Sequence, residues 1–299
     1  PPWMLLAIRP ISKEAHVAEV DTSTWKKTPD GIAIPPPSAD DVLYEVRDNV
    51  AWITLNRPLV LNAFNKNVQR LLMAALDRLE ADDDARVAVL IGAGRAFSAG
   101  GDMWAGLYPD DQPAPGGPEV QGRIWGLSKP VIAAVRGHAV GQGCELAGAC
   151  DLTIASETAR FGEIQIRHGF PPPFLITPYL VSMKRAKELL LLGEVILPEE
   201  AQRLGMVNRV VPDGELESAA EAVARKIASL PQTTVRLNKA LTNRAYELAG
   251  IRDGLAWNQD EAMRALSGQK DAVAEERHRI RQEKGWNEFK QERDRGYSG

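Results

Sequence analysis

The chain has 299 residues, 44% of them hydrophobic, so it is long enough to bury the core of one large domain. Its formal net charge of −4 argues against a nucleic-acid partner, because nonspecific nucleic-acid binding relies on a basic surface. No segment reaches the roughly 20 apolar residues that cross a bilayer, and the apolar run at residues 3–8 is too short for a secretory signal. We therefore predict a cytoplasmic protein without a membrane partner.

The chain is predicted to have three parts. Residues 1–40 form an irregular arm, because three consecutive prolines at residues 35–37 resist regular structure. Residues 41–197 form the core that carries the site. Residues 198–299 are mostly helical.

The core begins with a predicted hairpin and a helix. Residues 42–47 and 50–55 read as strands joined by a turn at Asp48 and Asn49. Residues 65–82 have the periodicity of an amphipathic helix. The apolar face of that helix consists of Val68, Leu71, Leu72, Ala75, Leu76 and Leu79.

Two further strands each end in a loop of small residues. An apolar run at residues 87–91 precedes RAFSAGGDM at residues 95–103, and a second run at residues 131–135 precedes a glycine-rich turn. The glycines of that turn are Gly137, Gly141 and Gly143. Between the two motifs, residues 108–118 are rich in proline, glycine and aspartate, which predicts a loop.

A helix beginning near Gly143 would direct unpaired N–H groups and the positive end of its dipole at a ligand. One backbone donor from each glycine-rich loop would suit a carbonyl oxygen that gains negative charge. Glu145 falls in the first turn of this helix, where apolar neighbours could tune it as an acid or base. Cys144 and Cys150 lie on different faces of the same helix, so we expect neither a disulfide nor a metal site there.

The last third of the chain continues with one strand and several helices. Residues 204–211 predict a short strand, and residues 215–230 and 234–248 predict amphipathic helices. The final 30 or so residues mix both charge signs, which favours a solvated helix. The alternative is a subunit-wrapping tail anchored by Trp286 and Phe289.

Five blocks in order give the chain a clear resemblance to the crotonase family, also called the enoyl-CoA hydratase/isomerase superfamily. The blocks are NRPLVLNAF at residues 56–64, AFSAGGDM at 96–103, KPVIAAVRGHAVGQGCELAGACDL at 129–152, ARFGE at 159–163 and EEAQRLGMVNRVV at 199–211. The resemblance implies an α/β fold, a crotonase-like spiral of ββα units with a C-terminal helical trimerisation and lid region. It also implies a homotrimer or dimer of trimers that acts on an acyl-CoA thioester, with coenzyme A as part of the substrate and no separate cofactor or metal.

By position in these motifs, the resemblance implies that the backbone N–H groups of Gly101 and Gln142 form the oxyanion hole. It implies Glu145 and Gln165 as the catalytic pair. Two residues depart from the family pattern. Gln142 replaces a small residue of the turn, and Gln165, in FGEIQ, stands where the hydratases have their second catalytic glutamate. A glutamine can hold water but cannot exchange its proton, so a two-glutamate mechanism would be weakened.

Two nearby residues offer a replacement acid or base. Glu163 shares a side with Gln165 if the segment is extended, although a loop hydrogen-bonding or surface role is favoured for it. His168 titrates near neutrality when unperturbed, although a structural role is favoured for it too.

We assign seven residues to substrate binding. They are Ala63, Ser98, Ala99, Asp102, Gly141, His168 and Phe170. The stiff sequence FPPPF at residues 170–174 favours a flat or cyclic acyl group against Phe170 or Phe174. Arg57 is a candidate for coenzyme A binding, with a solvated strand-end charge as the alternative.

Hydration or dehydration of an enoyl-CoA ranks first among the predicted activities. Double-bond isomerisation and hydrolysis of a cyclic keto-acyl-CoA come next, followed by acyl-CoA binding with little catalysis. Restoring the second carboxylate by Gln165→Glu is expected to raise hydratase turnover if the pocket is otherwise intact.

Overall fold

The computed structural model describes residues 22–262, 264 and 271–297. Its centre is a six-stranded sheet in the order β10-β8-β6-β5-β4-β3, in which only β3 and β4 pair antiparallel. The strands are β3 Val42–Arg47, β4 Val50–Leu55, β5 Val87–Gly92, β6 Val131–Val135, β8 Leu152–Ser156 and β10 Arg209–Val211. A two-stranded parallel sheet pairs β7, His138–Val140, with β9, Arg160–Gly162. The predicted α/β class is confirmed.

The β3–β4 hairpin follows from the conformation of its two turn residues. Asp48 and Asn49 have φ angles of 49° and 63°, and a two-residue type I′ turn requires positive φ at both central positions. Arg47 pairs with Val50 directly across this turn. The predicted hairpin is confirmed.

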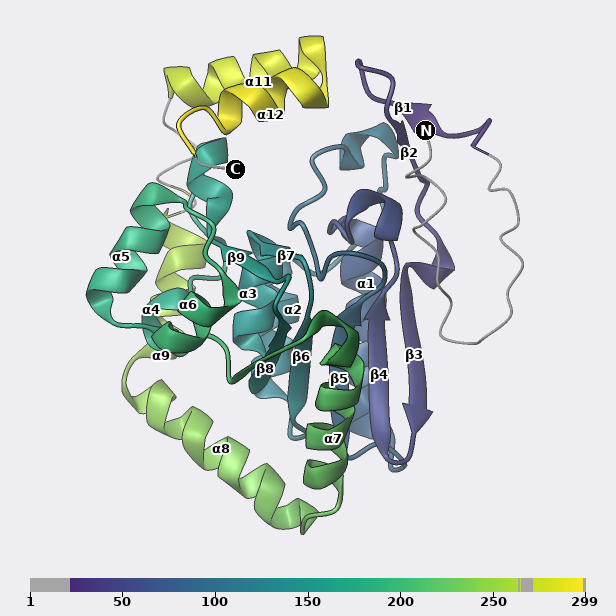
Figure 1. The fold of residues 1–299 in the computed structure, drawn as a ribbon, viewed down its shortest axis with the longest axis vertical. Helices are drawn as coiled ribbons and strands as arrows, with labels where there is room; N and C mark the ends of the chain where they lie inside the picture. Colours follow the sequence, from purple (N-terminus) through teal and green to yellow (C-terminus); the bar gives the residue numbers. More distant parts are fainter. Residues whose placement is uncertain (1–21, 263, 265–270, 298–299) are drawn as a thin grey trace.

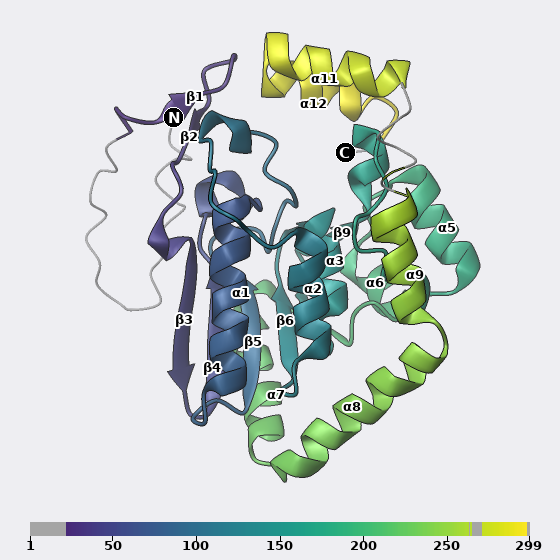
Figure 2. The same cartoon turned by 180° about the vertical axis from the view of Figure 1, so that it is seen from behind.

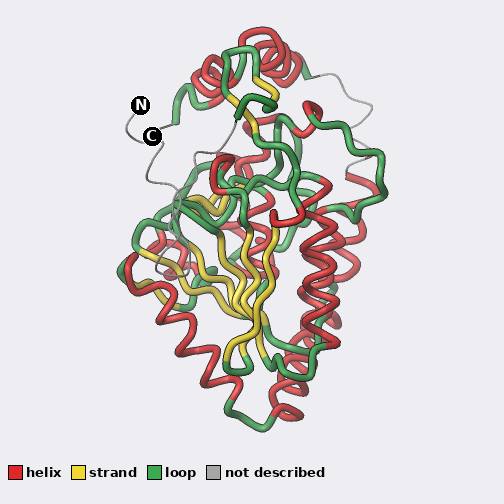
Figure 3. The backbone as a smooth tube through the Cα atoms, turned by 90° about the vertical axis from the view of Figure 1, so that its right-hand side faces the viewer, coloured by secondary structure: helices red, strands yellow, loops and turns green. Residues whose placement is uncertain are grey.

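Helices cover both faces of the large sheet (Figures 1 and 2). On one face lie α1, Lys66–Ala81, and α2, Gly117–Gly126, while α7, Leu216–Ala228, covers the other. The predicted helix at residues 65–82 is confirmed as α1, whose N-cap Asn65 accepts the Val68 N–H through its side-chain oxygen. Figure 3 shows the strands as a layer between these helices.

The remaining helices follow the glycine-rich turn and β9. They are α3 Gln142–Ala149, α4 Thr177–Leu180, α5 Met183–Leu192, α6 Pro198–Leu204, α8 Gln232–Leu248, α9 Ile251–Trp257, α11 Ala272–Lys284 and α12 Trp286–Arg293, with a π-helical turn at Asn258–Ala262. None of the helices within the described ranges is long and apolar enough to cross a membrane.

The strand predicted at residues 204–211 is shorter than expected. Leu204 is the last residue of α6, and Gly205 ends that helix in the left-handed region with φ of 93°. Only Arg209–Val211 pairs with the sheet, as β10. The apolar pattern was right about a strand but did not locate the helix end.

The N-terminal arm is not wholly irregular. Within its described part, β1, Lys26–Lys27, pairs antiparallel with β2, Ala33–Ile34. The Tyr108 hydroxyl accepts the Lys26 N–H at 2.7 Å and donates to the Ile34 carbonyl at 2.9 Å. A side chain distant in sequence therefore holds the two strands, which local patterning could not reveal. The rest of the arm, residues 1–21, lies outside the described residues.

The C-terminal helices α11 and α12 lie across one end of the molecule, near the arm (Figure 1). Arg281 donates to the Met103 carbonyl at 2.6 Å, and the Asn287 N–H donates to the Asp30 carboxylate at 2.9 Å. Phe289 is buried and stacks on His168, with 5.5 Å between ring centroids. The tail is thus more than a solvated helix, because it packs against its own chain.

Candidate active site

Two loops, one after β5 and one after β7, meet beside α3. The Phe64 N–H donates to the Gly100 carbonyl, and the Asp102 N–H donates to the Phe64 carbonyl, each at 2.8 Å. The Gly101 N–H points opposite to the Gly100 carbonyl across their trans peptide bond, so it faces away from Phe64. A Cβ atom on Gly100 would lie 2.7 Å from the Val140 carbonyl oxygen and 3.3 Å from the Gln142 nitrogen. The two predicted oxyanion loops are therefore in direct contact.

The N–H of Gln142 has no intrahelical acceptor, because Gln142 is the first residue of α3. Gly141 precedes it with φ of 56°, a conformation that favours glycine. The side chain of Gln142 extends toward the first turn of α2, where a Cβ on Gly117 would collide with its Nε2 atom. The long side chain that departs from the family pattern is thus accommodated by a glycine.

Glu145 is fully buried and accepts hydrogen bonds from three segments. The Phe174 N–H and Gln165 Nε2 donate to its Oε1 atom at 3.2 and 3.1 Å. Gln121 Nε2, from α2, donates to Oε2 at 3.3 Å. Gln121 was missed by sequence reasoning, although a polar residue in the buried stripe of a helix was an available signal.

Glu163 is also buried, so the surface role considered from sequence is wrong, whereas the hydrogen-bonding role is confirmed. The Thr177 hydroxyl donates to its Oε1 atom, and Gln165 Nε2 donates to its Oε2 atom at 3.0 Å. One amide nitrogen therefore links the two carboxylates.

Burial shifts the pKa values of both Glu145 and Glu163. Desolvation raises the pKa of Glu145 well above its ordinary value, and the nearby charge of Glu163 raises it further. Desolvation also raises the pKa of Glu163, against the hydrogen bonds from Thr177 and Gln165. The raised pKa values lie closer to neutral pH than that of an ordinary carboxyl, which suits a general base, and both groups are ionised at pH above them.

The orientation of the Gln165 amide follows from these neighbours. When both glutamates are ionised they only accept hydrogen bonds, so the Gln165 nitrogen faces them and its oxygen faces away. Oε1 of Gln165 is buried and has no hydrogen-bond partner among the described residues, and the same holds for Oε1 of Gln121. A buried acceptor without a donor suits water or a substrate group.

The family model for enoyl-CoA hydratase/isomerase matches residues 45–294 of this chain. The chain belongs to this family. It is 40% identical over 248 residues to a probable enoyl-CoA hydratase of Rhizobium meliloti, covering 79% of this chain and 95% of the relative. A short-chain-enoyl-CoA hydratase of Clostridium acetobutylicum is 36% identical over 246 residues, covering 78% of this chain and 93% of the relative.

A solved structure extends the likeness to the fold. An enoyl-CoA hydratase/isomerase from Xanthobacter autotrophicus Py2 has a TM-score of 0.80 and 34% identity, covering 87% of this chain and 99% of that chain. A carnitinyl-CoA dehydratase from Mycobacterium avium 104 has a TM-score of 0.68 and 33% identity, covering 82% of this chain and 98% of that chain. The predicted crotonase-like fold is confirmed.

Several residues assigned to substrate binding hold the loops of this enoyl-CoA hydratase/isomerase family member. The Ser98 hydroxyl donates to the Asn62 carbonyl at 2.9 Å and accepts the Gly100 N–H at 3.1 Å. The Ala99 N–H donates to the Leu61 carbonyl at 2.9 Å. Direct contact of these residues with substrate stays a prediction.

Arg57 is buried, so neither a solvated charge nor an exposed cation for coenzyme A describes it. Its Nη1 atom donates to the Asp102 carboxylate at 2.9 Å and the Ala63 carbonyl at 2.8 Å, and Nε lies 3.5 Å from Asp41. Through these contacts with Arg57, Ala63 and Asp102 help to hold the oxyanion loop that follows β5.

Replacing Arg57 with methionine should lower the free energy of unfolding by about 3–5 kcal/mol, because two buried carboxylates would lose their cation. Arg47→Met is the matched control, since the Arg47–Glu45 pair is exposed and should be worth under about 1 kcal/mol. Urea unfolding followed by circular dichroism measures both. Equal losses in the two variants would contradict a structural role specific to Arg57.

His168 is turned toward an aromatic cluster, with 6.0 Å between its ring centroid and that of Phe170 and 5.5 Å to that of Phe289. Burial, followed by the charges of Arg293 and Arg281, lowers its pKa to about 4. The imidazole is therefore neutral at pH 7, which supports a packing role. Phe174 is buried, so Phe170 is the exposed aromatic ring at the ends of the proline segment.

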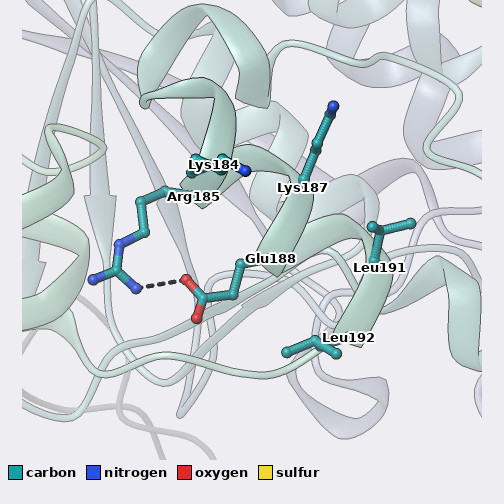
Figure 4. Close-up of a pocket in the computed structure, with 6 residues that line it drawn as sticks. All are labelled: Lys184, Arg185, Lys187, Glu188, Leu191 and Leu192. Carbon is teal, nitrogen blue, oxygen red and sulfur yellow. Dashed lines mark hydrogen bonds and ion pairs between the residues drawn. The ribbon is translucent and has the colours of Figure 1, made fainter.

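Two surface hollows lie away from these residues. One, on α5, is lined by Lys184, Arg185, Lys187, Glu188, Leu191 and Leu192 (Figure 4). Its Arg185–Glu188 ion pair and exposed leucines provide no acid–base centre. The other, of about 380 Å³, lies between the α3–α4 region and α8. We place the site at Glu145 because hydrogen-bond donors, unpartnered acceptors and two buried carboxylates converge there. No cluster of metal-binding side chains occurs within the described residues.

Proposed function

We propose that this protein hydrates enoyl-CoA thioesters and catalyses the reverse dehydration. The observation that carries the proposal is the chain of contacts from Glu145 through Gln165 to Glu163, next to the two oxyanion loops. A Cβ on Gly141 would lie 3.9 Å from Cδ of Gln165, which places the amide beside the second loop.

In the proposed reaction, the N–H groups of Gly101 and Gln142 bind the thioester oxygen. Water adds to the β-carbon while Glu145 takes its proton, and the electron pair of the double bond moves to the thioester oxygen as an enolate. Glu145 then returns the proton to the α-carbon. Gln165 holds the attacking water. This single-base sequence requires no proton transfer by glutamine.

The substrate would bring coenzyme A with it, so the proposal includes no separate cofactor and no metal. Ala63, Ser98, Ala99, Asp102, Gly141, His168 and Phe170 remain the proposed substrate-binding residues. Isomerisation of a double bond and hydrolysis of a cyclic keto-acyl-CoA use the same enolate, so they are the alternative reactions. The non-enzymatic alternative is that the protein binds acyl-CoA with little catalysis.

Purified protein should be incubated with linear, aromatic and alicyclic enoyl-CoA thioesters and the products resolved by mass, with Glu145→Ala as the control. We expect a product heavier by one water molecule that is absent with the control. A product of unchanged mass with a moved double bond would instead assign isomerisation. Saturable binding without any product would assign the binding role.

We further propose a homotrimer or dimer of trimers in the cytosol. Exposed apolar side chains on α8, which extends away from the sheet in Figure 1, support self-association. These are Leu237, Leu241, Tyr246 and Leu248. Two free cysteines are compatible with a reducing compartment. Sedimentation equilibrium tests the assembly, and a monomer at micromolar concentration would contradict it.

A further inference from the structure

Glu163 is a buried carboxylate that the hydration steps above do not use. It precedes the 3₁₀ segment Ile164–His168, and only 2% of it is exposed. Burying a charge is costly unless it is paired or hydrogen-bonded. The two groups that satisfy it are the Thr177 hydroxyl and the Gln165 amide. Glu163 therefore contacts Gln165, which holds the attacking water in the proposed reaction.

The position of Glu163 restricts the Gln165 amide to one orientation. Both protons of Nε2 are used, one toward Glu145 at 3.1 Å and one toward Glu163 at 3.0 Å. Rotating the amide by 180° would place its oxygen against two acceptors and break both hydrogen bonds. The unpartnered oxygen of Gln165 is therefore held on the side away from the carboxylates.

We propose that Glu163 is a positioning residue that fixes the Gln165 amide so that its Oε1 atom accepts a hydrogen bond from the water added to the double bond. The inference rests on the proposed hydratase function. Glu163 neither gains nor loses a proton in this role. The proton of the water passes to Glu145 and then to the α-carbon.

The charge of Glu163, rather than its shape, is the property that selects the amide orientation. In Glu163→Gln the side chain keeps its size, but its own amide can either donate or accept. A flipped Gln165 amide would still turn its oxygen toward Glu145, but the new amide at position 163 can donate to that oxygen and compensate for the hydrogen bond lost. The water therefore loses its fixed acceptor. Misplacing a reacting group costs up to about 100-fold in rate, so we expect hydration to fall roughly 10- to 100-fold.

The experiment compares two reactions of the same variants. The first is hydration of but-2-enoyl-CoA, which needs a positioned water. The second is exchange of the α-hydrogen of butanoyl-CoA in D₂O, which needs Glu145 and the oxyanion donors but no attacking water. We expect Glu163→Gln to lose hydration as stated and to keep exchange within about threefold of wild type. Glu194→Gln, an exposed change of the same charge, is the matched control and should alter neither rate.

Rates are compared on the pH plateau, because removing Glu163 also changes Glu145. The charge of Glu163 contributes to the raised pKa of Glu145, so its removal should move the acidic limb of both rate profiles to lower pH. Cys144 is also a titratable neighbour of both glutamates, and desolvation raises the pKa of its thiol well above its ordinary value. The remaining contacts, Gln121, Thr177 and the Phe174 N–H, are uncharged.

Glu163→Gln/Gln165→Glu supplies the rescue. A carboxylate at position 165 accepts a hydrogen bond from water directly, and an amide at position 163 can hold it. We expect the double variant to hydrate at least about ten times faster than Glu163→Gln. Its rate of α-hydrogen exchange should stay within about threefold of wild type. If the single variant does not fold, the double variant carries the test through its ratio of hydration to exchange, which should be no lower than wild type.

Three results would overturn the role of Glu163 alone: hydration unchanged in Glu163→Gln, hydration and exchange falling together, or no rescue in a folded double variant. Wild-type protein that exchanges but does not hydrate would overturn the proposed function itself, and this role with it. The wild-type control therefore separates the two failures.

Discussion

Replacing Glu145 with glutamine should lower hydration turnover by about 10²- to 10⁴-fold, the usual contribution of a general acid or base. The variant keeps the side-chain shape but removes the carboxylate that contacts both Gln121 and Gln165. Because the step at the α-carbon also needs Glu145, exchange of the α-hydrogen should fall by a similar factor. Steady-state rates and deuterium incorporation measure the two effects.

The same loss should appear in kcat more than in KM, because Glu145 acts on the reacting atoms rather than on coenzyme A. Glu194→Gln controls for the loss of one negative charge. Circular dichroism and thermal melting confirm that the variant remains folded. Retained exchange in a folded Glu145→Gln would show that another group moves the proton.

Gly100→Ala should lower turnover by about 10²- to 10³-fold, comparable with the loss of one oxyanion donor. The added Cβ would approach the Val140 carbonyl to 2.7 Å and the Gln142 nitrogen to 3.3 Å, and Gly100 has φ of 86°. The steric contact and the strain of a side chain at positive φ should separate the two loops that carry the proposed donors. We therefore expect the backbone N–H groups of Gly101 and Gln142 to move apart while Glu145 stays in place.

Gly106→Ala is the matched control for this variant. It lies in the 3₁₀ turn Ala105–Leu107, and a Cβ at that position has no heavy-atom neighbour within 4 Å. We expect it to retain wild-type turnover. Binding of an acyl-CoA enolate mimic, measured by calorimetry, should weaken in Gly100→Ala but not in Gly106→Ala. Equal binding by both would contradict the oxyanion assignment.

The structure also changes the expectation for Gln165→Glu. On sequence alone this substitution only restores a carboxylate, whereas in the fold it removes the amide that donates to Glu145 and Glu163. Three buried carboxylates would then meet, and mutual repulsion would raise their pKa values. The gain in turnover expected for this single change thus requires Glu163→Gln as well.

Much of the fold could be predicted because its signals are local. The turn at Asp48–Asn49, the apolar face of α1 and the glycines after β5 and β7 each act within a few residues of sequence. The position of Glu145 in the first turn of α3 was predictable for the same reason. Local patterns determine element type and the chemistry placed at element ends.

The contacts around Glu145 were not predictable, because they join segments that are distant in sequence. Gln121 comes from α2, while Thr177, which holds Glu163, comes from α4. Burial of Arg57 likewise depends on Asp41 and Asp102, which flank it on separate segments. Whether a charged side chain is solvated or buried is decided by tertiary packing, which a single sequence does not display.

The proposed oxyanion donors are main-chain groups, and this has a consequence for how the protein can diversify. Every residue except proline offers the same N–H, so a side chain at position 142 can vary without removing the donor. Gln142 illustrates this freedom. Its side-chain amide lies beside Gly117, while its backbone N–H remains at the start of α3. Pocket shape can thus evolve separately from the stabilisation of the enolate.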